Sequence, residues 1–373
     1  MLDLKFTRTF HQAAAKDFLL HSLAGGSFPQ ALLIHGPAGV GQTALVIDLA
    51  QMLLCDSKVT KPCGTCIRCL EWQRMNRDNL HYLVPSSDAQ QKNRDSRIDT
   101  GSSRWKMLLE DPYSGLCSAR EHISIGQVRD LTERLGYSEI AARKRVVIIF
   151  WAESMLEPAA NSLLKLLEEP PPHTFFLLSC EHKAGMIPTI LSRCVLLNLA
   201  PLSHSSMEEF LLTKGADSKF THSKDLLFLC NGSPGTYLEL VNHEGTAMLA
   251  LAKSFMQHTL QGDWFALSEL IDRDSSFDDM EKSLKMLNLT LEIIRVGLSS
   301  AHRSVNKGNE AAMWSLDGKS TGDMNHVIDL VHNYPGIDQY VNYIEDSISA
   351  VRHYAKPSHA LLGNFLALET AER

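Results

Sequence analysis

The chain lacks the features that would assign it to a membrane, to export or to general nucleic-acid binding. Its 373 residues contain no run of about 18 apolar residues that could span a bilayer. The opening MLDLKFTRTF has neither the cationic start nor the apolar core of a signal peptide. The formal net charge is −7, so the chain as a whole has no electrostatic attraction to phosphate backbones. We therefore expect a cytoplasmic protein with no membrane partner.

The composition is that of a globular protein, with 44% hydrophobic and 21% charged residues. The length is sufficient for two or three domains. In a cytoplasmic chain, the eight cysteines are expected to be thiols or metal ligands and not disulfides.

Residues 36–43 read Gly-Pro-Ala-Gly-Val-Gly-Gln-Thr, which has the glycines of a phosphate-binding loop (P-loop). Such a loop wraps phosphates with backbone N–H groups at a helix N-terminus, and a lysine before the Ser/Thr neutralises their charge. Gln42 stands in place of that lysine and carries no charge. We therefore expect weak or no ATP binding and no efficient hydrolysis, although a plain glycine-rich turn also fits these eight residues. The candidate nucleotide contacts are Gly36, Gly39, Gly41, Gln42 and Thr43.

Strand and helix patterns alternate through the first 200 residues. Apolar runs predict strands at 31–35, 80–84, 145–150, 174–180 and 194–199, and helical patterns cover 43–54, 126–135 and 158–169. This alternation predicts an α/β domain with a parallel sheet over about residues 1–200.

Two other regions depart from this alternation. Residues 86–104 are polar and predict a mobile insertion, which extends to about residue 121 and is expected to be peripheral, with a short helix at 105–110. After Pro201 the pattern is helical, with apolar stripes at three- and four-residue spacing. Core packing or an exposed partner surface could explain these stripes, which are Leu284, Leu287, Leu291, Ile294 and Leu298, and Ile337, Val341, Ile344, Ile348 and Val351.

Four cysteines, Cys55, Cys63, Cys66 and Cys69, have the spacing of a metal site. Two overlapping C-x-x-C steps can turn three thiolates toward one point, and Cys55 can complete a tetrahedron. Four sulfurs leave no open position, so we expect structural zinc, with an iron–sulfur cluster or free thiols as alternatives. The scattered remaining cysteines are expected to be small buried or neutral residues; they are Cys117, Cys180, Cys194 and Cys230.

A second catalytic charge is missing after the strand at 145–150. An ATPase needs an acidic residue at the end of this neighbouring strand to hold Mg²⁺. The sequence has Phe150 and Trp151 there, and the first carboxylate is Glu153. Glu153 could serve only if the strand end were shifted, and a surface or helix-capping role is the alternative.

The order of these motifs resembles the clamp-loader branch of the AAA+ ATPases. The likeness is carried by residues 159–171, which read AANSLLKLLEEPP, by Thr174–Leu178 and by Leu191-Ser192-Arg193-Cys194. The cysteines that follow Leu53-Leu54 narrow the resemblance to the clamp loader of bacterial DNA polymerase III, whose gamma/tau and delta-prime types of subunit share this insertion. The altered P-loop favours the delta-prime type.

The resemblance implies a non-hydrolysing stator subunit in the DNA polymerase III holoenzyme. Arg193, in the motif Ser192-Arg193-Cys194, would act in trans as an arginine finger on the ATP site of an adjacent subunit. A structural ion pair is the other interpretation of this arginine. The implied partners are the gamma/tau ATPase subunits and the delta subunit, and indirectly the sliding clamp and primed DNA.

Other positions carry over from the same resemblance. Ser179 stands where active members place a polar residue that senses the γ-phosphate, and Gly235, in the turn Asn231–Gly235, stands where they place a phosphate-binding arginine. The resemblance also implies three domains: 1–200 with a zinc module at about 55–80, a helical lid at 201–245 and a helical collar at 246–373. Lys356-Pro357 and the leucine-rich helix that follows resemble the C-terminal end of the family.

Two alternatives remain open. A gamma/tau-like ATPase could retain weak hydrolysis through Gln42 and Glu153. The cysteine segment could instead bind nucleic acid, although its basic residues alternate with acids and Trp72 is its one aromatic side chain; these basic residues are Lys58, Lys61, Arg68, Arg74 and Arg77.

Overall fold

The computed structural model describes residues 2–73, 79–87, 100–113, 121–136, 144–213, 224–301, 329–331, 333–352 and 356–361. The chain forms two compact units. The first comprises Met1–Leu202 together with Ser233–Thr236, and the second comprises Ser203–Gly232 and Tyr237–Arg373. The three predicted domains divide the same chain differently beyond residue 200 and remain a prediction.

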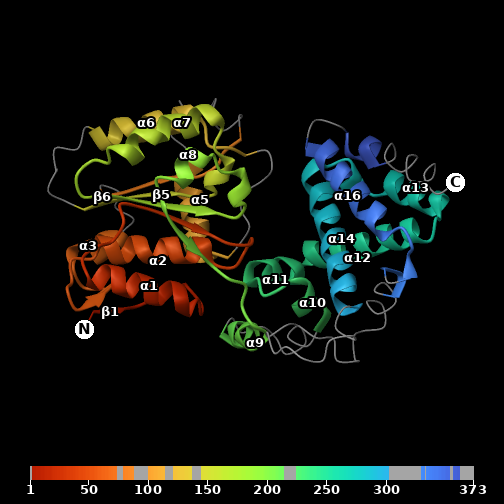
Figure 1. The fold of residues 1–373 in the computed structure, drawn as a ribbon, viewed down its shortest axis with the longest axis horizontal. Helices are drawn as coiled ribbons and strands as arrows, with labels where there is room; N and C mark the ends of the chain where they lie inside the picture. The colour runs from red at the N-terminus through yellow and green to blue at the C-terminus, as the bar shows by residue number, and fades with distance from the viewer. Residues whose placement is uncertain are drawn as a thin grey trace. The chain divides into compact units, whose positions relative to one another are not determined.

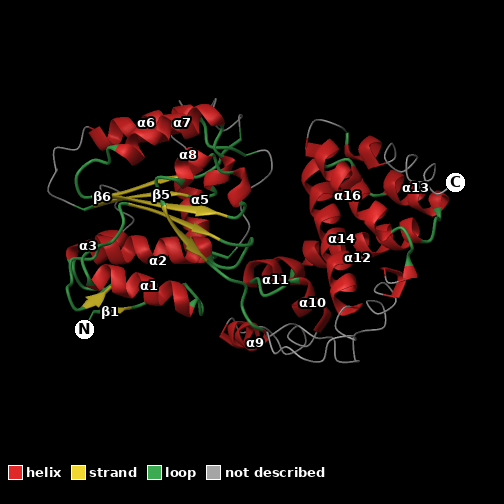
Figure 2. Ribbon diagram, in the orientation of Figure 1, coloured by secondary structure: helices red, strands yellow, loops and turns green. Residues whose placement is uncertain are grey.

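A five-stranded parallel sheet forms the centre of the first unit (Figure 2). Its strand order is β4-β5-β6-β2-β7. All five strands were predicted, and their ends differ from the prediction by at most one residue, which confirms the parallel α/β fold. The strands are β2 (Ala31–His35), β4 (Leu80–Leu83), β5 (Arg145–Ile149), β6 (Thr174–Cys180) and β7 (Val195–Asn198).

Helices cover both faces of this sheet, with α1 and α2 on one face and α6 and α7 on the other (Figure 1). Alternate strand residues supply the two cores, as the period of two requires. Ile148 of β5 belongs to the core under α2, whereas Ile149 belongs to the core under α6 and α7. The helices of this unit are α1 (Ala13–Ala24), α2 (Gln42–Leu54), α3 (Ile67–Gln73), α5 (Thr100–Glu110), α6 (Ile125–Gly136), α7 (Glu157–Glu168) and α8 (Pro188–Leu191).

The insertion was predicted to be peripheral, and the structure corrects this. Helix α5 begins at Thr100, inside the stretch that was expected to be mobile. Trp105 and Leu108 are buried in the main core, and the Trp105 ring stacks on Tyr82 of β4 at 5.0 Å between centroids. The Arg104 guanidinium also binds Pro85 O and the Glu121 carboxylate. Residues 88–99 and 114–120 lie outside the described part of the chain.

The second unit is helical wherever the structure describes it, as predicted. Helix α14 packs against both α12 and α16. Of the predicted stripes, Leu287, Ile294, Ile344 and Val351 are buried, so core packing explains them. The helices are α9 (His204–Thr213), α10 (Lys224–Leu229), α11 (Pro234–Val241, whose first three residues belong to the first unit), α12 (His243–Leu260), α13 (Trp264–Arg273), α14 (Met280–Ala301) and α16 (Ile337–Arg352).

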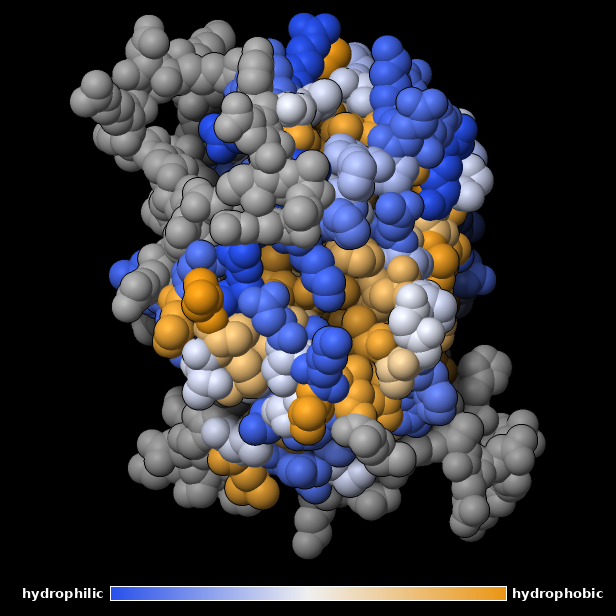
Figure 3. Space-filling model, turned by 90° about the vertical axis from the view of Figure 1, so that its left-hand side faces the viewer, coloured by the Kyte–Doolittle hydropathy of each residue, from blue (hydrophilic) through white to orange (hydrophobic). Residues whose placement is uncertain are grey.

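Among the described helices, none combines the length and the apolar character needed to cross a membrane. The side shown in Figure 3 mixes hydrophilic and hydrophobic side chains.

Candidate functional site

The P-loop sequence occupies the position that a phosphate-binding loop requires. It follows the carboxyl end of β2 and leads into α2, which begins at Gln42. Gly39 and Gly41 have φ values of 73° and 112°, in a region that favours glycine, so the loop keeps its backbone shape. Gln42 and Thr43 are both buried.

The side chain of Gln42 turns back into its own loop. Its Nε2 donates hydrogen bonds to Gly36 O at 2.5 Å and to Pro37 O at 2.8 Å. Both amide hydrogens are therefore used by the carbonyls of the loop. Gln42 thus stabilises this conformation of its own loop, and neither of its amide hydrogens is left to donate to a phosphate.

A turn from much later in the chain also lies on the P-loop and belongs to the same unit. Ser233 Oγ donates to Ala38 O at 2.7 Å, and Gly235 N donates to Gly39 O at 2.9 Å. A Cβ placed on Gly235 would lie 2.7 Å from the Gly39 Cα, closer than real side chains approach. The position where active relatives would carry an arginine thus has no room for a side chain.

Asp48 of α2 fixes the N-terminal segment beside the P-loop helix. Its buried carboxylate accepts hydrogen bonds from Thr7 Oγ1, Arg8 N, Thr9 N and Thr9 Oγ1 at 2.9 to 3.1 Å. The Arg8 guanidinium lies 3.4 Å from the same carboxylate. A buried charge with this many donors is a strong structural anchor.

Asp48→Asn is expected to lower the free energy of unfolding by about 3 kcal/mol, because an amide removes the charge and directs N–H donors at N–H donors. Urea unfolding measures this difference. Asp17→Asn is the matched control, since Asp17 is exposed on α1 and its replacement should leave the unfolding curve unchanged. Equal curves for both variants would contradict the anchoring role.

The end of β5 has no acidic residue directed to the P-loop. Phe150 and Trp151 are buried, and Trp151 N donates to Ser179 Oγ at 3.1 Å. Glu153 Oε1 accepts hydrogen bonds from Glu181 N at 2.7 Å and His182 N at 3.3 Å. Ser179 and Glu153 therefore both hold backbone at the ends of β5 and β6.

Arg193 lies in the short turn between α8 and β7, with a third of its side chain exposed. Its Nε donates to Glu168 Oε1 at 2.8 Å, and Nη2 binds the same oxygen. Its Nη1 donates to Thr189 O at 2.9 Å and to Ser192 Oγ at 3.3 Å. Four of the five N–H donors of the guanidinium are thus directed to the chain itself.

Cys194 contributes differently from its two motif neighbours. Its side chain packs against the core under α6 and α7, and burial raises the pKa of its thiol to about 12. Cys194 therefore stays neutral and anchors the turn that carries Arg193.

The P-loop and Arg193 lie at opposite ends of two neighbouring parallel strands. Strands β2 and β7 are parallel neighbours, with Leu32 opposite Val195 and His35 opposite Asn198. The P-loop follows the carboxyl end of β2, whereas Arg193 precedes the amino end of β7. The paired residues alone separate the two by about 10 Å at roughly 3.3 Å per residue. Arg193 is therefore directed away from the P-loop of its own chain.

The four clustered cysteines come together as their spacing predicted. Their sulfur atoms all lie within 4.8 Å of one another, with Cys55 to Cys66 at 3.9 Å and Cys63 to Cys69 at 4.0 Å. Four sulfurs about 2.3 Å from a central zinc would be about 3.8 Å apart. The cluster could hold a metal ion and is compatible with structural zinc.

Backbone N–H groups surround these sulfurs. Cys63 N, Cys66 N and Cys69 N each donate to the preceding cysteine sulfur of the cluster at 3.3 to 3.5 Å. Donors from Thr65 and Cys66 lower the pKa of the Cys63 thiol to about 6, whereas burial raises the pKa of Cys55. N–H donors of this kind stabilise metal-bound thiolates.

A two-stranded parallel ribbon ties the cysteine segment to the N-terminus. It pairs β1 (Asp3–Leu4) with β3 (Thr60–Lys61), and Lys61 Nζ donates to Cys55 O at 2.5 Å. Arg68 pairs with Glu71, and the Trp72 ring packs edge-on against Trp105 at 5.7 Å. Lys61, Arg68 and Trp72, which the nucleic-acid alternative would need, thus contact other residues of the chain. Arg74 and Arg77 lie outside the described residues.

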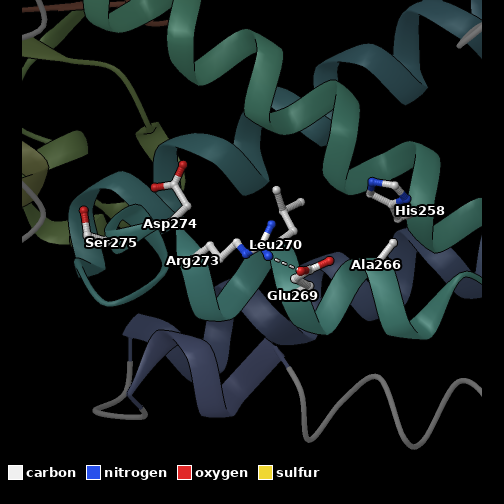
Figure 4. A pocket seen from close by; sticks show the side chains of 7 residues that line it. All are labelled: His258, Ala266, Glu269, Leu270, Arg273, Asp274 and Ser275. Carbon is white, nitrogen blue, oxygen red and sulfur yellow. Dashed lines mark ion pairs between the residues drawn. The ribbon is translucent and has the colours of Figure 1, made fainter.

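A separate pocket lies in the second unit, lined by His258 of α12 and by residues of α13 and the following turn (Figure 4). Its charges are the ion pair of Arg273 with Glu269, and Asp274, whose Oδ1 accepts from Ser276 N. The lining offers no excess positive charge for a phosphate, and we assign it no function.

Sequence reasoning missed two residues at these sites, Tyr113 and Glu168. Tyr113 lies against the P-loop, and Glu168 pairs with Arg193. Glu168 stands inside the motif that carried the family resemblance, and Tyr113 follows an aromatic and leucine cluster in an otherwise polar insertion. Both signals were present, but only the fold reveals their partners.

Comparisons with known proteins agree with the motifs. The family model described as DNA polymerase III, delta subunit, matches residues 11–203. The DNA polymerase III subunit delta' of Haemophilus influenzae is 31% identical over 186 residues, which are 50% of this chain and 47% of that protein. The subunit delta' of Escherichia coli is 25% identical over 356 residues, which are 92% of this chain and 95% of that protein. The chain thus matches about half of the first relative and nearly all of the second.

A gamma-type relative also matches. The DNA polymerase III subunit gamma of Buchnera aphidicola is 27% identical over 228 residues, which are 60% of this chain and 54% of that protein. Among solved structures, a gamma subunit-related protein from Thermotoga maritima aligns over 95% of this chain and 99% of its own at 13% identity, and its TM-score of 0.40 is too low to establish a common fold. The family model spans more than half of the chain and agrees with the delta' relatives, so the chain belongs to the family described as DNA polymerase III, delta subunit.

Proposed function

We propose that this chain is the non-hydrolysing delta-prime (stator) subunit of a bacterial replicative clamp loader and supplies Arg193 in trans to an adjacent ATPase subunit. The observation that carries the proposal is that the P-loop and Arg193 lie at opposite ends of the parallel strands β2 and β7. The Gln42 side chain fills the P-loop, while the exposed guanidinium of Arg193 lies at the opposite end of the strands. Such a chain can serve a neighbour's nucleotide but not its own.

The proposed partners follow from this role. An adjacent gamma/tau ATPase subunit would receive Arg193, and a delta subunit would complete the cytoplasmic assembly that loads the sliding clamp onto primed DNA. The helices beyond residue 200 would form the lid (201–245) and the collar (246–373). We further propose that Cys55, Cys63, Cys66 and Cys69 bind one structural zinc ion.

Reconstitution tests this function directly. The chain is combined with the gamma/tau and delta subunits of the same organism, and clamp- and DNA-stimulated ATP hydrolysis is compared for Arg193 and Arg193→Ala. Because the chain is also similar to gamma and tau subunits, a second candidate function is that of a gamma/tau-like ATPase with weak residual hydrolysis. ATP hydrolysis by the purified chain alone, at a rate above that of Gln42→Ala, would favour this second candidate.

The Glu168–Arg193 pair gives a prediction about the same reaction. The guanidinium must leave Glu168 before it can make a two-pronged contact with a phosphate, because the pair uses two of its five donors. An exposed pair of this kind contributes up to about 1 kcal/mol. Glu168→Gln is therefore expected to raise ATP hydrolysis of the reconstituted complex, at subsaturating ATP, by up to about fivefold.

Glu169→Gln is the matched control for this variant. Glu169 is the next residue, is also exposed, and has no ion pair among the residues that the structure describes. It should leave hydrolysis unchanged, and Glu168→Gln should have no effect once Arg193 is replaced by alanine. A fall in activity with Glu168→Gln would show instead that Glu168 orients the arginine for reaction.

A further inference from the structure

Tyr113 lies against the P-loop, although it belongs to the insertion. It follows α5 and is buried, with 3% of its surface exposed. A Cβ built on Gly41 would lie 3.1 Å from a ring carbon of Tyr113. Gly41 is the residue that precedes α2, and a phosphate held by a P-loop lies at that helix N-terminus. The tyrosine ring thus lies against the loop residue that borders this helix N-terminus.

The hydroxyl of Tyr113 fastens the ring to the N-terminal segment. Phe10 N donates to Tyr113 Oη at 3.0 Å, and Tyr113 Oη donates to Arg8 O at 3.1 Å. Burial raises the pKa of this hydroxyl to about 12, so it stays protonated at neutral pH. Asp48 holds the same N-terminal segment on α2 through Arg8 N and Thr9 N.

The backbone of Tyr113 contacts a third segment, the Ser233–Gly235 turn. Its carbonyl oxygen lies 2.3 Å from the place where a Cβ on Gly235 would be. Gly235 is hydrogen-bonded to Gly39 of the P-loop in turn. One buried residue of the insertion therefore contacts the N-terminal segment, the P-loop and the Ser233–Gly235 turn together.

We propose that Tyr113 is an internal plug, which takes the place of a nucleoside triphosphate over the P-loop and joins the three surrounding segments as a bound nucleotide would. This inference deepens the proposed non-hydrolysing function and rests on it. It assigns a role to the insertion: the nucleotide site is closed by packing, in addition to having lost its lysine. The conformation of the N-terminal segment, the loop and the turn is then independent of ATP.

Binding of Mg·ATP to the full-length chain, measured by equilibrium dialysis, tests the plug. The wild-type chain and Gln42→Lys should bind no ATP at millimolar concentration, because restoring the charge does not remove the ring. The double variant Gln42→Lys/Tyr113→Ala should bind ATP at least about tenfold more tightly than Gln42→Lys alone. The matched control is Gln42→Lys/Tyr113→Phe, which loses the hydroxyl contacts but keeps the ring and should stay closed.

Several outcomes would overturn the plug. One is equal ATP affinity of Gln42→Lys and the alanine double variant, and another is a double variant with a native circular dichroism spectrum that binds no ATP. If that variant does not fold, hydrogen exchange of the wild-type chain decides: millimolar Mg·ATP must leave the protection of the amides of residues 39–43 unchanged, and a change refutes the plug. Loss of the Arg193 effect in the reconstituted complex would refute the proposed function, whereas ATP binding to a wild-type chain that retains this effect would refute only the plug.

Discussion

Arg193→Ala is expected to lower ATP hydrolysis at the site that this chain is proposed to serve by about 10³- to 10⁵-fold, the range seen for arginine fingers in phosphoryl transfer. The planar guanidinium stabilises charge that develops on the transferring phosphoryl group, and alanine supplies nothing in its place. Single-turnover hydrolysis by the reconstituted complex measures this effect. Hydrolysis at sites that other subunits serve should continue, so the loss in the steady-state rate is smaller than the loss at the affected site.

Two further variants make the Arg193 result specific. Arg193→Lys keeps the charge but loses the fork of donors, so it should recover only part of the rate. Arg129→Ala removes an exposed arginine from α6 of the same unit and should leave the rate unchanged. Equal rates for Arg193→Ala and Arg129→Ala would show that Arg193 is no more than the partner of Glu168.

Removal of the metal is expected to have the second large effect. Structural zinc contributes about 10–16 kcal/mol of apparent binding free energy in zinc-finger peptides, so its loss should unfold residues 55–73 locally. Metal analysis should find about one zinc ion per chain. Cys63→Ser or prolonged chelation should remove it, and protease cleavage within the segment should then become fast. Tryptophan fluorescence should change as well, because Trp72 would leave Trp105.

Cys180→Ala is the control for the metal. Cys180 is buried in β6 and lies outside the four-sulfur cluster, so its replacement should keep the zinc content at the wild-type level. Iron in place of zinc would support the iron–sulfur alternative. A chain that contains no metal and resists protease equally before and after chelation would refute the metal site.

The sheet could be predicted because buried parallel strands leave a simple signal. Residues 31–34 and 146–149 are continuous apolar runs beside glycine or polar residues, and the strand ends lie within one residue of that contrast. Strands β1 and β3 have two residues each, which is too short for any periodicity. The burial of Trp105 was missed because its core partners Tyr82 and Phe150 are brought to it by the tertiary fold.

The candidate sites show the same limit. The cysteine cluster could be predicted because its four members lie within 15 residues, and local spacing determines whether they can converge. Gln42 could be predicted to lack a charge, but its return to Gly36 O depends on the folded loop. The contact of Tyr113 with Arg8 joins residues that are 105 positions apart, and no local pattern specifies it.

The parallel register of β2 and β7 has a consequence for the order of subunits in the proposed assembly. A chain that gives an arginine at one edge and accepts one at the other associates head to tail, through a heterologous interface. Under the proposed function, this chain gives Arg193 at one end of the strands and has no free nucleotide site at the other. A neighbour on that second side would have no nucleotide to act on, so the series of ATP sites would stop at this subunit. In the proposed assembly, the polarity of this pair of strands would set the direction of the series, and the P-loop blocked by Gln42 would set the place where it ends.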